Sequence, residues 1–154
     1  MKAAPMKKTR GEYTLSWDPA DQQPVRIHAY LSRSYWAGGI PLEVVRRSLA
    51  GSLGFGIFAG GEQVAFARVI TDGATFAYLC DVYVLEEFRG RGLAKWLLDE
   101  IVAHPQLRGL RRFLLFTRDA HALYARYGFA PLAQPRSAME IRRPDPYQAP
   151  PAEG

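Results

Sequence analysis

Cysteine is the scarcest residue type in this chain, because Cys80 is the only one among 154 residues. A single thiol excludes an internal disulfide and a zinc site built from several thiolates. The sequence also lacks any apolar stretch approaching the ~18 residues that a membrane helix needs. No apolar segment follows the basic N-terminal residues, as one would in a signal peptide. We therefore expect an unexported, cytoplasmic protein with no membrane partner.

Acidic residues are outnumbered, since fifteen Asp and Glu stand against twenty Lys and Arg, for a net charge of +5. Four of the basic residues, Lys2, Lys7, Lys8 and Arg10, precede the first acid. The rest of the chain is nearly balanced and shows no basic stripe of the kind that binds nucleic acid. We predict a disordered basic arm over residues 1–11, and a nucleic-acid partner is not expected.

The length and the hydrophobic content of 48% predict one globular domain over residues 12–143, followed by a disordered Pro-rich tail over residues 144–154. Hydrophobic periodicity gives the element order β-α-α-β-β-β-α-β-α-β. Hairpin strands followed by a β-α-β unit imply an α/β (α+β) fold, a mixed, mostly antiparallel sheet with helices on both faces. The strands are predicted at 12–17, 53–59, 62–71, 74–84, 110–117 and 137–143, and the helices at 24–34, 41–52, 93–103 and 119–127.

A glycine pair marks the connection after the third hairpin strand. The segment EEFRGRGLAKWLLDE, residues 86–100, places Gly90 and Gly92 just before an amphipathic helix. Glycine weakens a helix start, so the pair is expected to serve the backbone by allowing positive φ and close approach of an anion. The unpaired N–H groups of the helix N-terminus, with Arg89 and Arg91 beside them, would suit a pyrophosphate.

Two common phosphate-binding motifs do not fit this stretch. A P-loop needs Gly-x-x-x-x-Gly-Lys-Ser/Thr, which the chain lacks. A dinucleotide fingerprint needs a third glycine where the chain has Lys95, and a βαβ start in place of hairpin strands. A plain strand-to-helix turn flanked by solvated arginines is the simple alternative.

The stretch from Val84 to Ala94 resembles motif A of the GNAT superfamily of N-acetyltransferases, Arg/Gln-x-x-Gly-x-Gly/Ala, with Arg89, Gly92 and Ala94 at its fixed positions. Residues 120–129 are similar to a second signature of that superfamily, an alanine-rich short helix with a tyrosine four residues before Gly-Phe. Two motifs together are more specific than either alone. The resemblance, over residues 12–143, implies a GNAT-like fold and acetyl-coenzyme A as the cofactor.

The resemblance also implies where the cofactor would lie. In this superfamily it occupies a gap where two neighbouring strands splay apart. The backbone of Val82 and Val84 would pair with the pantetheine arm. Thr117 stands where many relatives have an asparagine that contacts the cofactor. The amides expected to hold the pyrophosphate are those of Arg89, Gly90, Arg91, Gly92, Leu93 and Ala94.

Acetyl transfer to a primary amine needs proton transfers, and two residues are candidates for them. Tyr124 matches the family's general-acid position, and a phenol with a pKa near ~10 can protonate a departing thiolate. Asp81, an acid in an apolar strand, is the candidate for amine binding or base work, and a structural ion pair explains it equally well. Strict alternation places Asp81 on the face of Leu79 and Tyr83, unless a bulge shifts the phase.

The acceptor pocket is expected to involve Tyr35 and Trp36, in the loop that commonly lines it in this family, together with Tyr78 and Cys80. Cys80 is interpreted as a small hydrophobe, because direct attack in a ternary complex needs no acyl-enzyme. The histidines share no ligand spacing, so no metal is predicted. The acceptor would be a small-molecule or peptide amine, and homodimers are frequent in the family. The alternative is a non-catalytic acyl-coenzyme A binding or regulatory module of the same fold.

Overall fold

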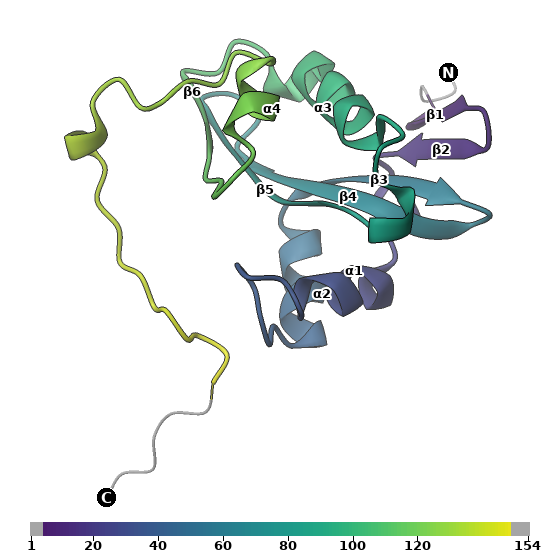
Figure 1. Cartoon of the computed structure of the whole chain (residues 1–154). Helices are drawn as coiled ribbons and strands as arrows, with labels where there is room; N and C mark the ends of the chain where they lie inside the picture. The colour runs from purple at the N-terminus through teal and green to yellow at the C-terminus, as the bar shows by residue number, and fades with distance from the viewer. Residues whose placement is uncertain (1–4, 149–154) are drawn as a thin grey trace, which may run out of the picture.

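The computed structural model describes residues 5–148 as a six-stranded sheet with helices on both faces (Figure 1). Strands β1 to β5 form an antiparallel meander, and β6 lies parallel to β5. The crossover that a parallel pair requires is made by α3. The elements are β1 Lys7–Arg10, β2 Tyr13–Ser16, α1 Pro24–Leu31, α2 Leu42–Ala50, β3 Leu53–Ala59, β4 Glu62–Thr71, β5 Phe76–Val84, α3 Leu93–Ala103, β6 Arg112–Leu115 and α4 His121–Ala125.

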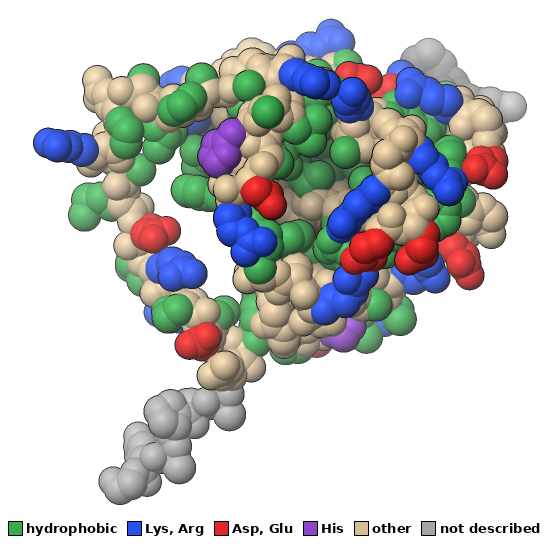
Figure 2. All heavy atoms as spheres, viewed as in Figure 1, with side chains coloured by type: hydrophobic (Ala, Val, Ile, Leu, Met, Phe, Trp, Pro, Cys, Tyr) green, Lys and Arg blue, Asp and Glu red, His purple; other side chains and the backbone are tan. Residues whose placement is uncertain are grey.

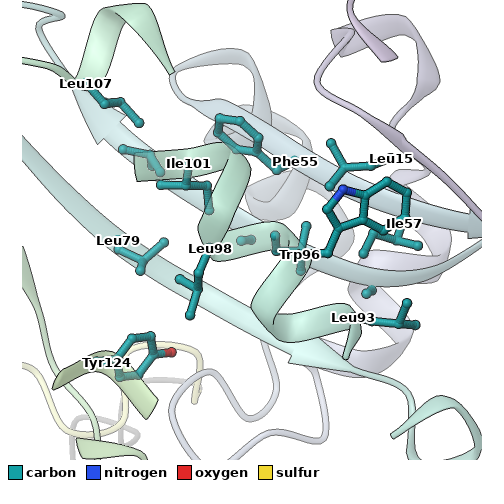
Figure 3. Packing of buried hydrophobic residues seen from close by; sticks show 14 of the residues in the cluster. Leu15, Phe55, Ile57, Leu79, Leu93, Trp96, Leu98, Ile101, Leu107 and Tyr124 are labelled. Atoms are coloured by element: carbon teal, nitrogen blue, oxygen red, sulfur yellow. The ribbon is translucent and has the colours of Figure 1, made fainter. Parts of the chain in front are cut away.

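Each face of the sheet carries its own hydrophobic cluster, which confirms the expectation of helices on both faces. Figure 3 shows the cluster under α3, where Trp96 and Ile101 lie over Phe55 and Ile57 of β3. Full burial of each such side chain contributes roughly 1.5–3 kcal/mol relative to exposure. The opposite cluster joins α1 and α2 to the sheet through Ile27, Leu31, Ala37, Ile40, Val45, Phe66 and Tyr83. None of the helices within residues 5–148 combines the length and hydropathy that a membrane crossing requires.

A buried pair of glutamines fixes the start of α1 against the sheet. Gln63 Nε2 donates to Gln22 Oε1 at 3.0 Å, and Gln63 Oε1 accepts from the Gln23 backbone N–H at 2.8 Å. Gly56 on β3 leaves the room for this pair, because a Cβ there would lie 2.5 Å from Gln63 Nε2 and 2.6 Å from Gln22 Oε1. These contacts anchor the N-terminal end of α1, the helix that leads into the loop with two predicted site residues.

The predicted disorder of the basic arm is wrong for residues 7–10, which form the edge strand β1 paired with β2. Its basic side chains have partners that the sequence pattern did not reveal. Lys8 Nζ lies 3.0 Å from Glu100 Oε2, and the guanidinium of Arg10 lies 4.5 Å from the centre of the Trp96 ring. A short, charged edge strand discourages pairing with other chains, which explains why so basic a segment suits this position. Residues 1–4 lie outside the described range.

The predicted strand at 137–143 is also wrong. A 3₁₀ turn covers Pro135–Ser137, and the chain from there to residue 148 forms neither helix nor strand. The alternating side chains Met139 and Ile141 are 96% and 89% exposed. Alternation makes a segment suitable for a sheet, but a strand also needs a neighbour, and within residues 5–148 this segment has none. The part of the predicted tail at 149–154 lies outside the described range.

Candidate active site

A β-bulge in β5 sets the geometry of the candidate site. Across β4 and β5, Phe66 is opposite Tyr83 and Arg68 is opposite Cys80, so that two residues of β5 face one of β4. The extra residue places Asp81 at φ 56, in the left-handed region that aspartate tolerates better than most residues.

The bulge reverses the phase of the strand. Leu79 belongs to the cluster under α3, whereas Tyr83, four residues on, belongs to the cluster under α1 and α2. Strict alternation would have placed both on one face. The departure from alternation lets Cys80, Asp81 and Val82 all line one cavity.

Next to the bulge, β5 and β6 separate. The two strands pair only from Phe76 to Leu79 on β5, and on that side the residues from 80 to 84 have no neighbouring strand within the described chain. A cavity of about 470 Å³ opens there, and we call it the β5–β6 cleft. Figure 2 shows this face hollowed, with hydrophobic side chains in the floor and charged ones around the rim. The cleft is lined by Tyr35, Trp36, Tyr78, Leu79, Cys80, Asp81, Val82, Leu115, Phe116, Thr117, Arg118, Asp119, Ala120 and Tyr124.

Asp81 forms a buried ion pair in the wall of the cleft. Its Oδ2 accepts a hydrogen bond from Arg68 Nε at 2.8 Å, and its Oδ1 accepts from Trp36 Nε1 at 2.9 Å. The side chains of Arg68 and Asp81 are 15% and 9% exposed. Both carboxylate oxygens therefore have partners, and the carboxylate ties the loop of Trp36 to the sheet.

The pKa of the Cys80 thiol shows that the cleft disfavours a negative charge. Burial, followed by the nearby charge of Asp81, raises the pKa of the Cys80 thiol to about 12. Because a thiolate is the nucleophilic form of cysteine, this thiol is inert at neutral pH. The neighbouring Tyr78 has its pKa raised as well, chiefly by burial.

Tyr124 enters the cleft from α4. The helix begins after a turn in which Thr117 Oγ1 accepts from the Ala120 N–H at 3.0 Å, and it ends near Gly128, whose φ is 94. The Tyr124 ring lies 6.0 Å from that of Phe129, at the margin of the cluster shown in Figure 3. Burial raises the pKa of Tyr124 to about 12, so its phenol is protonated at neutral pH. Within residues 5–148 its hydroxyl has no hydrogen-bond partner.

The glycine pair forms an exposed turn at the far end of β5. Gly90 and Gly92 have φ of 79 and 77, and a Cβ on either would meet no atom within 4 Å. The need for glycine here is therefore conformational, with open space in front of the backbone. Gly92 caps α3, whose first N–H groups are left without intrahelical partners. This turn can accept an anion.

The two arginines of the turn are tied to the protein. Arg89 Nε donates to the Val84 carbonyl at 3.0 Å, and Arg91 Nη1 donates to the Tyr13 hydroxyl at 2.6 Å. These bonds hold both guanidinium groups beside the turn. The Leu93 side chain is buried, so that only its backbone can face a ligand.

The predicted site residues thus fall into two groups. The β5–β6 cleft brings together Tyr35, Trp36, Tyr78, Cys80, Asp81, Val82, Thr117 and Tyr124. The second group lies outside the cleft, at the end of β5 and the start of α3, and comprises Val84, Arg89, Gly90, Arg91, Gly92, Leu93 and Ala94.

Sequence reasoning missed three charged residues of the site. Arg68 is the ion-pair partner of Asp81. The sequence held a signal of this pair, because a basic and an acidic residue occur on adjacent hairpin strands. The bulge obscured it, because it shifts Asp81 out of register with Arg68. Arg118 and Asp119 line the mouth of the cleft, and the Arg118 guanidinium lies 3.9 Å from the centre of the Tyr35 ring. They lie in the turn between β6 and α4, where the sequence has no periodic pattern that would mark a residue as part of a site. The described residues hold no cluster of His, Cys, Asp and Glu suited to a metal.

Comparison with known proteins identifies relatives of the chain. Residues 12–129 match the family model described as the acetyltransferase (GNAT) family. A Gibberella zeae protein named as an acetyltransferase is 36% identical to this chain over 145 residues. The match covers 79% of this chain and 81% of the relative.

Solved structures of acetyltransferases are also similar to this chain. An assigned GNAT-family acetyltransferase of Xanthomonas campestris pv. campestris has 54% identity and a TM-score of 0.87, over 89% of this chain and 97% of that one. An acetyltransferase assigned in Clostridium acetobutylicum, whose structure contains acetyl-CoA, has 18% identity and a TM-score of 0.61, over 84% and 94% of the two chains. The second likeness bears on the fold alone.

Proposed function

The chain belongs to the acetyltransferase (GNAT) family, and from this premise we propose that it transfers an acetyl group from acetyl-coenzyme A to a primary amine by direct attack in a ternary complex. The observation that carries the proposal is the separation of β5 and β6. It puts the protonated Tyr124 in the same cleft as the unpaired edge of β5, and the glycine turn follows at the end of that strand.

The residues present fit coenzyme A. An unpaired strand edge can take up an extended, amide-containing arm. The exposed turn at Gly90 and Gly92 offers backbone N–H groups to a diphosphate, at the positive end of α3. When bound, acetyl-coenzyme A supplies the activated thioester. We assign the backbone of Val82 and Val84 to the arm, the Thr117 hydroxyl to a polar contact beside it, and residues 89–94 to the diphosphate.

We assign Tyr124 the role of general acid. Its raised pKa keeps a proton on Oη, and a departing thiolate is the group that would take it. Ordinary values would make this transfer uphill, because a thiol is the stronger acid. Burial in the cleft raises the pKa of the Cys80 thiol to about 12. A second sulfur desolvated in the same cleft would also have a raised pKa, which favours its protonation.

We assign the acceptor amine to the side of the cleft formed by Tyr35, Trp36, Tyr78 and Cys80, with Asp81 as the group that holds Trp36 in place. The alternative, a module that binds acyl-coenzyme A without catalysis, has one observation in its favour. Asp81, our candidate base, is already engaged by Arg68, so base work would have to compete with a buried ion pair.

Replacement of Tyr124 tests the proposed reaction. The wild-type protein is first screened against amines with acetyl-coenzyme A, and release of free thiol is followed. With the best amine, Tyr124→Phe should lower kcat by about 10²-fold to 10⁴-fold, the range for a lost general acid, and leave the Kd for coenzyme A unchanged. Cofactor binding without turnover of any amine would support the alternative. An unchanged kcat in Tyr124→Phe would remove the general-acid assignment but leave the transferase activity standing.

Asp81→Asn separates two roles for that residue. A base would be revealed by a fall in kcat and the loss of an acidic limb in the pH profile. A residue that positions Trp36 would instead raise the KM for the amine, with the pH profile unchanged.

A further inference from the structure

Two charged side chains at the mouth of the β5–β6 cleft have no ionic partner among the described residues. Arg118 and Asp119 are consecutive in the turn between β6 and α4, and both line the cleft. Neither forms an ion pair within residues 5–148, whereas Asp81 in the wall is paired with Arg68. Figure 2 shows charged side chains around the rim of this hollow. The mouth therefore offers one positive and one negative charge to a ligand.

The guanidinium of Arg118 is placed by an aromatic ring. It lies 3.9 Å from the centre of the Tyr35 ring, which packs edge-on against Trp36 with the ring centres 5.0 Å apart. Trp36 is fixed in turn by its hydrogen bond to Asp81. A guanidinium over an aromatic face keeps N–H donors free at its edge, and their fork matches the two oxygens of a carboxylate. Arg118 can therefore bind an anionic group at the mouth of the cleft.

The carboxylate of Asp119 lies on the side of the mouth near Tyr124. Burial, followed by the neighbouring Tyr35 and Asp119, raises the pKa of Tyr124 to about 12. The charge of Asp119 can act on this phenol only from nearby. Asp81, the other acid in the lining, has both carboxylate oxygens hydrogen-bonded already. Asp119 is therefore the carboxylate of the lining that can receive an ammonium group, close to the tyrosine to which we assign proton donation.

Aromatic side chains form much of the wall around these charges. Tyr78 of β5 and Phe116, which follows β6, pack edge to face with their ring centres 5.9 Å apart. Tyr35 and Trp36 come from the loop after α1. Phe116 and Tyr35 are 70% and 56% exposed. Exposed rings gathered at a cleft can pack against an apolar part of a ligand.

On the premise of the acetyl transfer proposed above, we propose that the acceptor is a zwitterionic amino acid with an aromatic or other apolar side chain. Arg118 binds its carboxylate, Asp119 receives its ammonium group, and the aromatic wall packs against its side chain. The choice of a carboxylate over a phosphate rests on charge. Arg118 is the one basic residue of the cleft lining within residues 5–148, and Asp119 offsets it, so the mouth matches a zwitterion better than a dianion.

Titration calorimetry on the full chain saturated with coenzyme A tests this acceptor class without any need for turnover. L-Phenylalanine should bind at least about tenfold more tightly than 2-phenylethylamine, which has the same ring and an amine but no carboxylate. It should also bind more tightly than glycine, which lacks the ring, and than O-phosphoethanolamine, which carries a phosphate. Comparable binding of any of these three ligands would overturn the proposal, as would the absence of measurable binding of L-phenylalanine.

Variants of the two charged residues test their separate roles. Arg118→Gln should weaken binding of L-phenylalanine by at least about tenfold and leave the Kd for 2-phenylethylamine unchanged, while Arg118→Lys should recover part of the loss. Asp119→Asn should weaken both ligands, because both carry an ammonium group. Arg126→Gln is the matched control, because Arg126 is exposed at the end of α4 and does not line the cleft. An equal effect of Arg118→Gln on both ligands would contradict its role in binding the carboxylate.

Release of free thiol from acetyl-coenzyme A separates this proposal from the proposed function. If the chain acetylates amines without preference for L-phenylalanine over 2-phenylethylamine, acetyl transfer stands and the amino acid acceptor is contradicted. If L-phenylalanine binds with the expected selectivity but no amine is acetylated, the binding site stands and acetyl transfer is contradicted. Circular dichroism checks that each variant folds.

Discussion

Arg68 and Asp81 form an ion pair between β4 and β5 that lies one residue out of the ladder register. Arg68 is opposite Cys80, yet its Nε donates to Asp81 Oδ2 at 2.8 Å, because the bulge turns Asp81 towards it at φ 56. The other oxygen of the same carboxylate accepts from Trp36 Nε1. One side chain thus connects the sheet to the loop that carries Trp36.

Neutralising Asp81 should destabilise the fold. Asp81→Asn keeps a residue that tolerates positive φ, and it removes the charge together with one of the two acceptor oxygens. Removal of one partner leaves Arg68 as a buried, uncompensated charge, and we expect a loss of about 3 kcal/mol or more in the free energy of unfolding, measured by urea denaturation. The control is Glu43→Gln in the exposed Glu43–Arg47 pair, for which the loss should be about 0.5 kcal/mol or less. If Asp81→Asn lowered the free energy of unfolding by only about 0.5 kcal/mol or less, as expected for the exposed control pair, the buried ion pair would be contradicted.

Gly56 should not accept even one methyl group. In Gly56→Ala the new Cβ would displace Gln22 and Gln63 from their mutual hydrogen bond, and overpacking of this kind lowers the free energy of unfolding by about 1–3 kcal/mol. Gly54→Ala on the same strand is the control, since its nearest contact would be 3.3 Å from Phe66 and its effect should be smaller. Thermal unfolding followed by circular dichroism compares the two variants, and equal midpoints would disprove the steric explanation.

The turn at Gly92 should be needed both for folding and for the cofactor. Gly92→Ala forces φ away from 77, which lowers stability by about 1–2 kcal/mol, and it turns the free N–H groups away from an anion. Titration calorimetry should show at least a tenfold weaker Kd for coenzyme A, about 1.4 kcal/mol. Gly60→Ala, in the β3–β4 turn with φ 59, has the same backbone conflict and should lose stability without losing affinity. If both variants bind coenzyme A like wild type, the turn does not hold the cofactor.

Cys80 should behave as a protected thiol. Its pKa is raised from 9.0 to about 12 in the folded protein, so at pH 8 the native thiol should react with iodoacetamide about 1000-fold more slowly than the same thiol in urea. The sign for stability follows from the same shift. The folded state holds the proton more tightly, so this contribution is present below about pH 9 and is lost as the pH rises to about 12. If Cys80 in the native protein reacted with iodoacetamide as fast as a free thiol, water would have better access to this thiol than the geometry of the cleft implies.

Local sequence was sufficient for the features that depend on a few neighbouring residues. Gly90 and Gly92 mark a positive-φ turn at the start of α3, and Gly128 follows the short helix that carries Tyr124. The order of the five central strands and helices also follows from periodicity. These predictions hold because φ preferences and amphipathic spacing act over one or two turns of chain.

Errors occurred where a strand needed a particular neighbour. Residues 7–10 seemed too charged for a sheet, yet β2, Glu100 and Trp96 supply partners for them. Residues 137–143 had a suitable alternation, yet β6 of the same chain does not pair with them within the described range. The pairing of a strand depends on what lies beside it in space, which periodicity does not encode.

The sequence by itself determined the positive-φ turn at Gly90 and Gly92, the position of Tyr124 on a short helix, and the family to which both motifs pointed. The tertiary structure decided the environment of those residues. A one-residue bulge gives Asp81 its partner, and the end of pairing after Leu79 opens the cleft in which Tyr124 and Cys80 acquire their raised pKa values. The physical reason is that burial and strand register depend on contacts between segments far apart in the chain, whereas backbone conformation at a glycine is local.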